Sequence, residues 1–240
     1  MKNILISVHV IFLLQIPVIS FAGEFEYPTS EVERPLTLPK SMVEISGAWN
    51  YTPKEEYTDY SSINIRYGIT DTLEIFSLGL KERVSFMNGK HELALIAVAL
   101  GSSTEGVSAK GGFEGKWRVA GNAALIYRMD ATTNPGGDIK NDTKWIFGGI
   151  YSFTDKASMT LHGDYWTRQV LQEGSTLLDN SIYNDYIIKE LVVRFAYNHS
   201  ARIDIFMEGK YSTYPGTIYM EGITYADSKE AYALGAALRF

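Results

Sequence analysis

The sequence predicts an all-β fold, a transmembrane antiparallel up-and-down β-barrel. Apolar and polar residues alternate along much of the chain, which is the period of a strand with one apolar and one polar face. After the first 22 residues no segment is apolar and long enough for a membrane helix, which needs about 20 residues. Compact turns alternate with long polar stretches, as expected when one rim carries short turns and the other carries loops.

Met1 to Ala22 is predicted to be a cleaved secretory signal. Lys2 precedes an apolar run from Ile4 to Ile19, and Ser20-Phe21-Ala22 places small residues where a signal peptidase cleaves. The run is shorter than a membrane-spanning helix, and Pro17 interrupts it. We therefore expect export through the Sec pathway and no helical anchor.

Residues 23–40 are predicted to form an extended periplasmic segment that precedes a barrel over residues 41–240. The segment contains Pro28, Pro35 and Pro39, and proline cannot donate a hydrogen bond to a strand ladder. It is too short to be the plug domain of an energy-coupled transporter.

The predicted strands have one apolar and one charged face. In the segment from Met42 to Tyr51, Val43, Ile45 and Trp49 alternate with polar residues. In a barrel, the apolar face contacts lipid and the charged face lines the lumen. The other period-2 segments are residues 62–69, 118–128, 144–153, 159–165, 190–198, 203–211 and 231–240.

Turn signals set the expected number of strands at twelve. Long polar stretches at 130–143, 167–185 and 214–229 are predicted to be outer loops. With both ends of the barrel in the periplasm, five inner turns give twelve strands. Residues 73–87 must then hold two strands with a bend near 77–79; one long strand there would reduce the count to ten. The five turn signals are Thr70-Asp71-Thr72, Asn88-Gly89-Lys90, Glu114-Gly115-Lys116, Thr154-Asp155-Lys156 and Asn198-His199-Ser200.

The last strand places Tyr232, Leu234, Leu238 and the terminal Phe240 on one apolar face. A strand that ends on an aromatic residue of the apolar face resembles the terminal signature of bacterial outer-membrane barrels. The resemblance implies a location in the Gram-negative outer membrane. It also implies two partners for these residues, outer-membrane lipids and the barrel-assembly machinery.

Three further segments carry a broader resemblance. They are Arg34-Pro-Leu-Thr-Leu-Pro39-Lys40, Arg66-Tyr67-Gly68-Ile-Thr-Asp71 and Leu78-Gly-Leu-Lys81. With Phe240 they resemble the broad group of Gram-negative outer-membrane barrels that includes the phenol-degradation "MetA-pathway" barrels. The resemblance implies a passive pore for small solutes, with no cofactor and no catalytic residue.

Composition excludes several classes of function. The net charge is −6 and no basic stretch occurs, which argues against nucleic acid as a partner. The chain has no cysteine, so it has no disulfide framework and no thiolate metal site. We predict no bound metal or cofactor. The alternative fold is a secreted β-sandwich rich in tyrosine.

If the polar faces point inward, charges of both signs line the lumen. They can pair across a narrow barrel and plug it, or leave a thin wet path with little preference for ion sign. Two functions therefore stay open: a passive pore, and a plugged structural barrel or one that binds partners through tyrosines of its outer loops. The predicted lumen-lining residues are Arg66, Arg118, Arg128, Lys144, His162, Asp164, Glu190, Arg194, Asp204, Glu208 and Lys210.

A hydrolase is the third hypothesis. His162 and Asp164 share one strand face, and a His–carboxylate pair can activate water. The order is the reverse of the Asp-His pair in omptin proteases, and His162-Gly163-Asp164 lacks the serine of outer-membrane phospholipase A. We therefore assign no catalytic residue and predict that the protein is not an enzyme.

Overall fold

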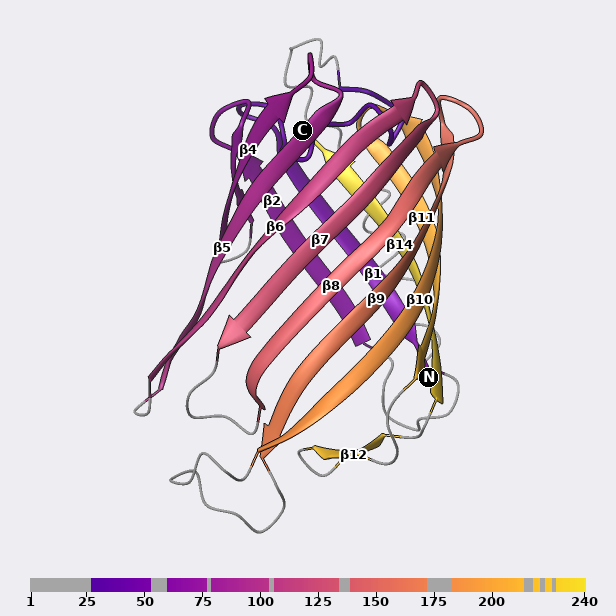
Figure 1. Cartoon of the computed structure of the whole chain (residues 1–240). Helices are drawn as coiled ribbons and strands as arrows, with labels where there is room; N and C mark the ends of the chain where they lie inside the picture. The colour runs from indigo at the N-terminus through magenta and orange to yellow at the C-terminus, as the bar shows by residue number, and fades with distance from the viewer. Residues whose placement is uncertain are drawn as a thin grey trace, which may run out of the picture.

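Twelve strands of the computed structural model close into one antiparallel barrel (Figure 1). This confirms the predicted fold class, and it confirms twelve strands rather than ten. Among the described residues, no helix is long and apolar enough to cross a membrane. The predicted signal, residues 1–22, lies outside the described part of the chain. The structure describes residues 27–52, 60–76, 79–103, 106–133, 139–171, 183–213, 218–220, 223–225 and 228–240.

The barrel strands follow one another around the wall in chain order. Two short strands, β12 (Ile218–Met220) and β13 (Ile223–Tyr225), form a separate sheet within the predicted last outer loop. The barrel strands are β1 (Val43–Tyr51), β2 (Tyr60–Gly68), β3 (Leu73–Phe76), β4 (Gly79–Phe86), β5 (His91–Ser103), β6 (Gly106–Ala120), β7 (Ala123–Thr133), β8 (Ile139–Ser152), β9 (Ala157–Leu171), β10 (Tyr183–Ser200), β11 (Ile203–Thr213) and β14 (Ser228–Arg239).

The C-terminal strand β14 closes the barrel against β1. The amides of Val43 and Phe240 each donate to the other residue's carbonyl oxygen, at 3.0 and 2.9 Å. Tyr232 and Leu234 on β14 are 48% and 56% exposed on the outer face. Because the first and last strands pair, their backbone groups are satisfied without water, as hydrocarbon requires.

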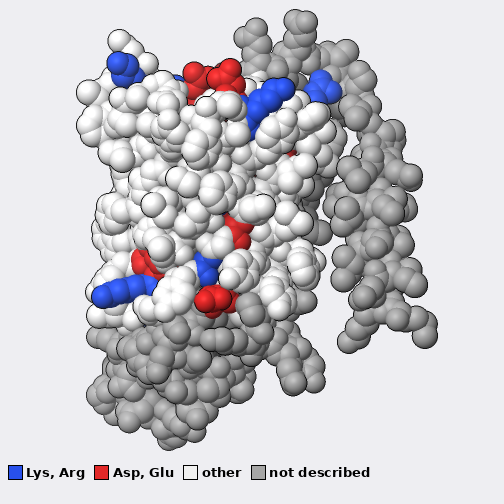
Figure 2. Space-filling model, turned by 90° about the vertical axis from the view of Figure 1, so that its right-hand side faces the viewer, with Lys and Arg blue, Asp and Glu red and all other residues white. Residues whose placement is uncertain are grey.

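The outer face of the wall is apolar and the inner face is charged. Ile63 is 77% exposed, whereas Glu74 and Glu92 are each 1% exposed. Figure 2 shows a largely uncharged band between zones of Lys, Arg, Asp and Glu at the two ends. This inversion of the pattern of a soluble protein suits a wall that faces lipid.

The hairpin β3–β4 resolves the crowded stretch 73–87 into two strands. β3 has four residues and pairs with only the last three residues of β2. Phe76 lies opposite Gly79, so the two strands form a tight antiparallel pair. The wall is therefore built from shorter strands here than elsewhere.

The predicted turn at Glu114–Lys116 is wrong, because β6 runs through these residues and the turn lies at 121–122. Gly115 has a different role. A Cβ atom there would meet the Tyr127 Cζ at 2.0 Å, so the glycine makes room for the phenol ring. The Tyr127 hydroxyl lies 2.7 Å from His91 Nε2. The glycine thus marks close packing of an aromatic ring on the wall.

Two threonine turns connect neighbouring strands at the same rim. Thr70 Oγ1 accepts a hydrogen bond from the amide of Leu73 at 2.9 Å, and Thr154 Oγ1 accepts one from Ala157 at 3.0 Å. The predicted turn at 198–200 is displaced, because β10 extends to Ser200 and the turn follows at 201–202. Short turns define the periplasmic end of an outer-membrane barrel, which is the upper end in Figure 1.

Candidate functional site

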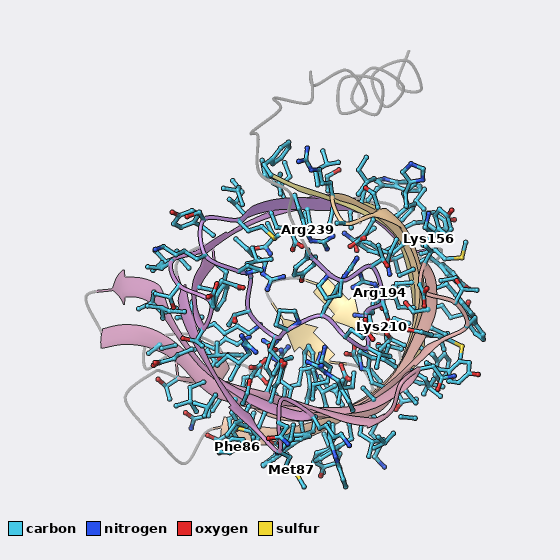
Figure 3. All side chains as sticks on the ribbon, turned by 90° about the horizontal axis from the view of Figure 1, so that it is seen from above. Phe86, Met87, Lys156, Arg194, Lys210 and Arg239 are labelled. Atoms are coloured by element: carbon cyan, nitrogen blue, oxygen red, sulfur yellow. The ribbon has the colours of Figure 1, made fainter. Side chains whose placement is uncertain are left out.

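Residues 27–40 lie inside the periplasmic end of the barrel. Val32, Thr37 and Leu38 are completely buried, and contacts of the segment reach several strands of the wall. The view down the barrel in Figure 3 looks onto this end. This position differs from the expected extended segment outside the barrel. We call residues 27–40 the N-terminal segment.

Buried carboxylates of the wall hold the backbone of the N-terminal segment. The amide of Leu36 donates to Glu92 Oε2 at 2.9 Å, and the amide of Leu38 donates to Glu74 Oε2 at 2.8 Å. A segment interrupted by prolines cannot join a strand ladder, so its buried amides need other acceptors. Hydrogen bonds to ionised acceptors are stronger than neutral ones. The inward-facing glutamates therefore explain why the segment enters the barrel.

Arg34 provides the main side-chain anchor of the segment. Its two terminal nitrogens donate to the two oxygens of Asp204 on β11, at 2.6 and 2.8 Å. Arg239 binds the same carboxylate, and its Nε donates to Glu44 at 2.7 Å. The guanidinium carbons of Arg34 and Arg239 also lie 5.3 and 4.9 Å from the centroid of the Tyr27 ring. Burial raises the pKa of Tyr27, so its phenol remains neutral at neutral pH.

The same network continues along β1, β2 and β3. Arg66 donates to Glu44 at 3.0 Å and to Glu74 at 2.7 Å. Asp204, Arg239, Glu44, Arg66 and Glu74 therefore alternate in sign in one connected chain. The cost of dehydrating such groups offsets much of their attraction. We interpret the network as fixing the position of the segment rather than adding much net stability.

Glu92 on β5 is a second point of attachment. Its Oε1 lies 2.7 Å from Arg118 and 3.3 Å from Arg83, while Oε2 accepts the amide of Leu36. Lys116 on the next strand donates to the carbonyl oxygen of Arg34. Glu92 therefore binds both the wall and the N-terminal segment, and Lys116 adds a second contact from the wall to the segment.

Five of the predicted lumen residues form one cluster on β8, β9, β10 and β11. Lys144 lies 2.6 Å from Asp164 and 3.4 Å from Glu190. His162 Nδ1 lies 2.6 Å from Asp164, and Lys210 lies 3.3 Å from Glu190. Figure 3 places Lys210, Arg194 and Arg239 within the ring of strands and Lys156 outside it.

This cluster contains the His162–Asp164 pair that the hydrolase hypothesis invokes. Both oxygens of Asp164 are engaged, one by His162 and the other by Lys144. Within the described ranges, His162 has no hydroxyl group as a hydrogen-bond partner. The pair therefore belongs to an ion network.

Arg128 belongs to a third cluster, on β4, β6 and β7. It lies 2.9 Å from Asp130 and 3.6 Å from Glu114. Lys81 also binds Glu114, and Lys110 lies 3.2 Å from Asp130. Charges of both signs therefore face one another on this side of the lumen as well.

A cavity of about 560 Å³ lies in the lumen next to the N-terminal segment. Arg194 and Glu208 line it, and within the described part of the chain neither side chain makes a hydrogen bond or an ion pair. The described residues contain no cluster of His, Asp and Glu that could hold a metal ion. Charged residues such as Arg194 and apolar residues such as Ile150 both line the cavity, so a solute inside it would contact both kinds of surface.

Sequence reasoning missed Tyr27, Arg34, Glu92 and Lys116, all of which position the N-terminal segment. A signal was present, because Val32, Leu36 and Leu38 are apolar residues in a stretch that we predicted to be an extended periplasmic segment. The interaction surface predicted on the outer-loop tyrosines, such as Tyr57 and Tyr214, lies outside the described residues.

Two solved structures with a similar fold are an outer-membrane channel and a porin. An outer-membrane channel from Pseudomonas putida F1 is 11% identical, with 91% of this chain and 99% of that chain covered and a TM-score of 0.52. The porin NanC is 8% identical, with 82% and 98% covered and a TM-score of 0.50. No protein-family model and no curated protein matches the sequence. At these identities the likeness establishes the fold, which is that of a Gram-negative outer-membrane β-barrel.

Proposed function

We propose that this barrel is a passive outer-membrane pore for small solutes, narrowed at its periplasmic end by the N-terminal segment. The cavity of about 560 Å³ inside the closed barrel carries this proposal. Charges of both signs line the lumen, so the pore distinguishes ions weakly by sign. Solutes cross it by diffusion, without a cofactor or an energy source.

The N-terminal segment sets the width of the path. Its anchors are hydrogen bonds and ion pairs, such as those of Arg34 with Asp204 and of Leu36 with Glu92. Because none of these contacts is covalent, the segment can leave its position without breaking the barrel wall. We infer that conductance depends on how often it does so.

A plugged barrel is the second candidate, favoured by the complete burial of Val32, Thr37 and Leu38 inside the periplasmic end. In that case the segment never leaves, and the barrel serves as a structural or surface-binding protein. The ion-paired His162 and Asp164 give a hydrolase no comparable support.

We also propose a route to the membrane. Residues 1–22 are removed after Sec export, and the barrel-assembly machinery recognises the last strand. The outward positions of Tyr232 and Leu234 support this role, because they leave an apolar face available to the machinery and to lipid.

The test is single-channel conductance of refolded residues 23–240 in a planar bilayer. Heat-modifiable migration in gels serves as the control for a closed barrel. Stable conductance steps support the pore. A folded barrel that never conducts contradicts it and favours the plugged barrel.

A further inference from the structure

We propose that the lumen cavity binds a small zwitterion with an aliphatic body, as in an α-amino acid with a branched aliphatic side chain. This inference rests on the proposed pore for access to the cavity, and it names the class of solute. It follows from two charges without partners, the platform that holds one of them, and an apolar patch on the same wall.

Arg194 and Glu208 differ from the other charges around the cavity. They are direct neighbours in the register of β10 and β11, yet in the described part of the chain neither side chain forms an ion pair or a hydrogen bond. Arg194 Nε is buried without a partner. By contrast, Arg34, Arg66 and Arg128 are all paired with carboxylates. An unsatisfied charge in a confined space is costly unless water or a ligand satisfies it.

A platform directs Arg194 away from Glu208. The Arg194 Cζ lies 4.0 Å above the centroid of the Phe206 ring. A Cβ atom on Gly235 would meet the Phe206 Cζ at 2.3 Å, so this glycine makes room for the ring. Stacking on an aromatic face leaves the planar nitrogens of a guanidinium free to bind a carboxylate in the fork geometry. Arg194 is thus held as a receptor for a carboxylate.

Apolar surface lies on the same level of the wall. Ile150, Thr160, Arg194 and Glu208 are consecutive register neighbours on β8, β9, β10 and β11. Strands lie about 4.8 Å apart, so Ile150 is about 10 Å along the wall from Arg194. Ile146 also lines the cavity, four residues away along β8 at the level of Asp164. A ligand that extends along the level of Ile150 would place its aliphatic part toward Ile150 and its charged part on Arg194 and Glu208.

A zwitterion fits this arrangement better than a simple ion. An organic anion would satisfy Arg194 but would meet the carboxylate of Glu208. An organic amine would satisfy Glu208 but would meet the positive charge of Arg194. An α-amino acid carries both charges on one carbon and can bind each group with a hydrogen bond between ions, the stronger kind. The cavity of about 560 Å³ is within the usual range for small-molecule sites.

The test is titration calorimetry on refolded residues 23–240 in detergent, with L-leucine as the probe. Three analogues each lack one feature. They are 4-methylpentanoate without the ammonium, 3-methylbutylamine without the carboxylate, and glycine without the side chain. We expect leucine to bind, and each analogue to bind about tenfold more weakly or worse.

Arg194→Gln and Glu208→Gln should each weaken leucine binding by about tenfold or more. The matched control is Arg202→Gln, in the turn at 201–202 and outside the cavity lining, which should leave affinity unchanged. All variants must show heat-modifiable migration.

Two results would overturn the inference. One is equal binding of 4-methylpentanoate and leucine with no effect of Glu208→Gln, which indicates a site for organic anions. The other is no binding of leucine. Conductance is measured separately. A barrel that conducts but does not bind leucine supports the proposed pore and contradicts the binding site. A barrel that binds leucine but does not conduct supports the binding site and contradicts the pore.

Discussion

The Arg34 guanidinium donates two hydrogen bonds, at 2.6 and 2.8 Å, to the two oxygens of Asp204, a residue 170 positions further along the chain. The pair joins the N-terminal segment to the inner face of β11. Arg239 binds the same carboxylate from β14. The position of the segment therefore depends on a charge network that reaches the strands near the end of the chain.

Arg34→Gln should raise the open probability of the pore. Removing one partner of a buried ion pair costs about 3 kcal/mol, so the population with a displaced segment should rise by more than about tenfold. Single-channel recording measures this. Lys40→Gln is the control, because it removes an exposed charge from the same segment. An Arg34 variant that conducts like the Lys40 variant would show that this pair does not hold the segment in place.

Glu92→Ala should destabilise the barrel. The side chain is 1% exposed, forms ion pairs with Arg83 and Arg118, and accepts a hydrogen bond from the amide of Leu36. Its loss removes the carboxylate partner of the half-buried Arg83 and Arg118 and the acceptor of the Leu36 amide, at a cost of about 3 kcal/mol in the free energy of unfolding. Urea unfolding followed by gel migration measures the change. Glu33→Ala, at an exposed position, should have no effect; an equal effect of the two substitutions would contradict the role of Glu92.

Gly115→Ala should impair packing of the wall. The new Cβ would meet the Tyr127 ring at 2.0 Å, and displacing the ring breaks its contact with His91. Overpacking of this kind costs about 1–3 kcal/mol. Gly163→Ala is the matched control, because its nearest contact would lie at 3.8 Å. The temperature at which the folded gel band disappears compares the two. A Gly115 variant as heat-stable as the Gly163 variant would rule out this packing role.

Single charge changes in the lumen should shift ion preference in opposite directions. Arg128→Ala removes a cation beside Glu114 and Asp130, so the pore should favour cations more strongly. Glu208→Ala should favour anions. Reversal potentials under a salt gradient measure both shifts. Lys156→Ala, outside the ring of strands, is the control; if neither lumen variant differs from it, ions do not follow the assigned lumen.

Strand periodicity was enough to predict the strands and their apolar faces. The alternation in β1, for instance, places Trp49 outside and Glu44 inside, as the sequence pattern predicts. Two-residue periodicity is a local property, so a single strand reveals which face contacts lipid. The count of inner turns predicted that residues 73–87 form two strands rather than one.

Gly115 shows where local reasoning fails. Glycine beside charged residues is a common turn signal, but here the glycine accommodates a ring from the neighbouring strand. Only the register of β6 and β7 brings Tyr127 to that position. The register of two strands cannot be inferred from the glycine and its sequence neighbours alone, so the turn at 121–122 was missed.

The site was harder to predict than the fold. The residues that hold the N-terminal segment come from opposite sides of the wall, such as Glu92 on β5 and Asp204 on β11. A segment with three prolines has no periodicity that shows which side is buried. Its location became evident only from the carboxylates that accept its amides.

A reversible cross-link between the segment and the wall tests the central claim most directly. The Ser30 and Ser152 hydroxyl oxygens lie 3.2 Å apart, and the chain has no cysteine of its own. Ser30→Cys combined with Ser152→Cys can therefore form a single disulfide. In planar-bilayer recordings we expect the oxidised barrel to remain in its narrow state and the reduced barrel to open like the unmodified protein. Equal conductance of the fully cross-linked and the reduced barrel would contradict the claim that the N-terminal segment controls the pore.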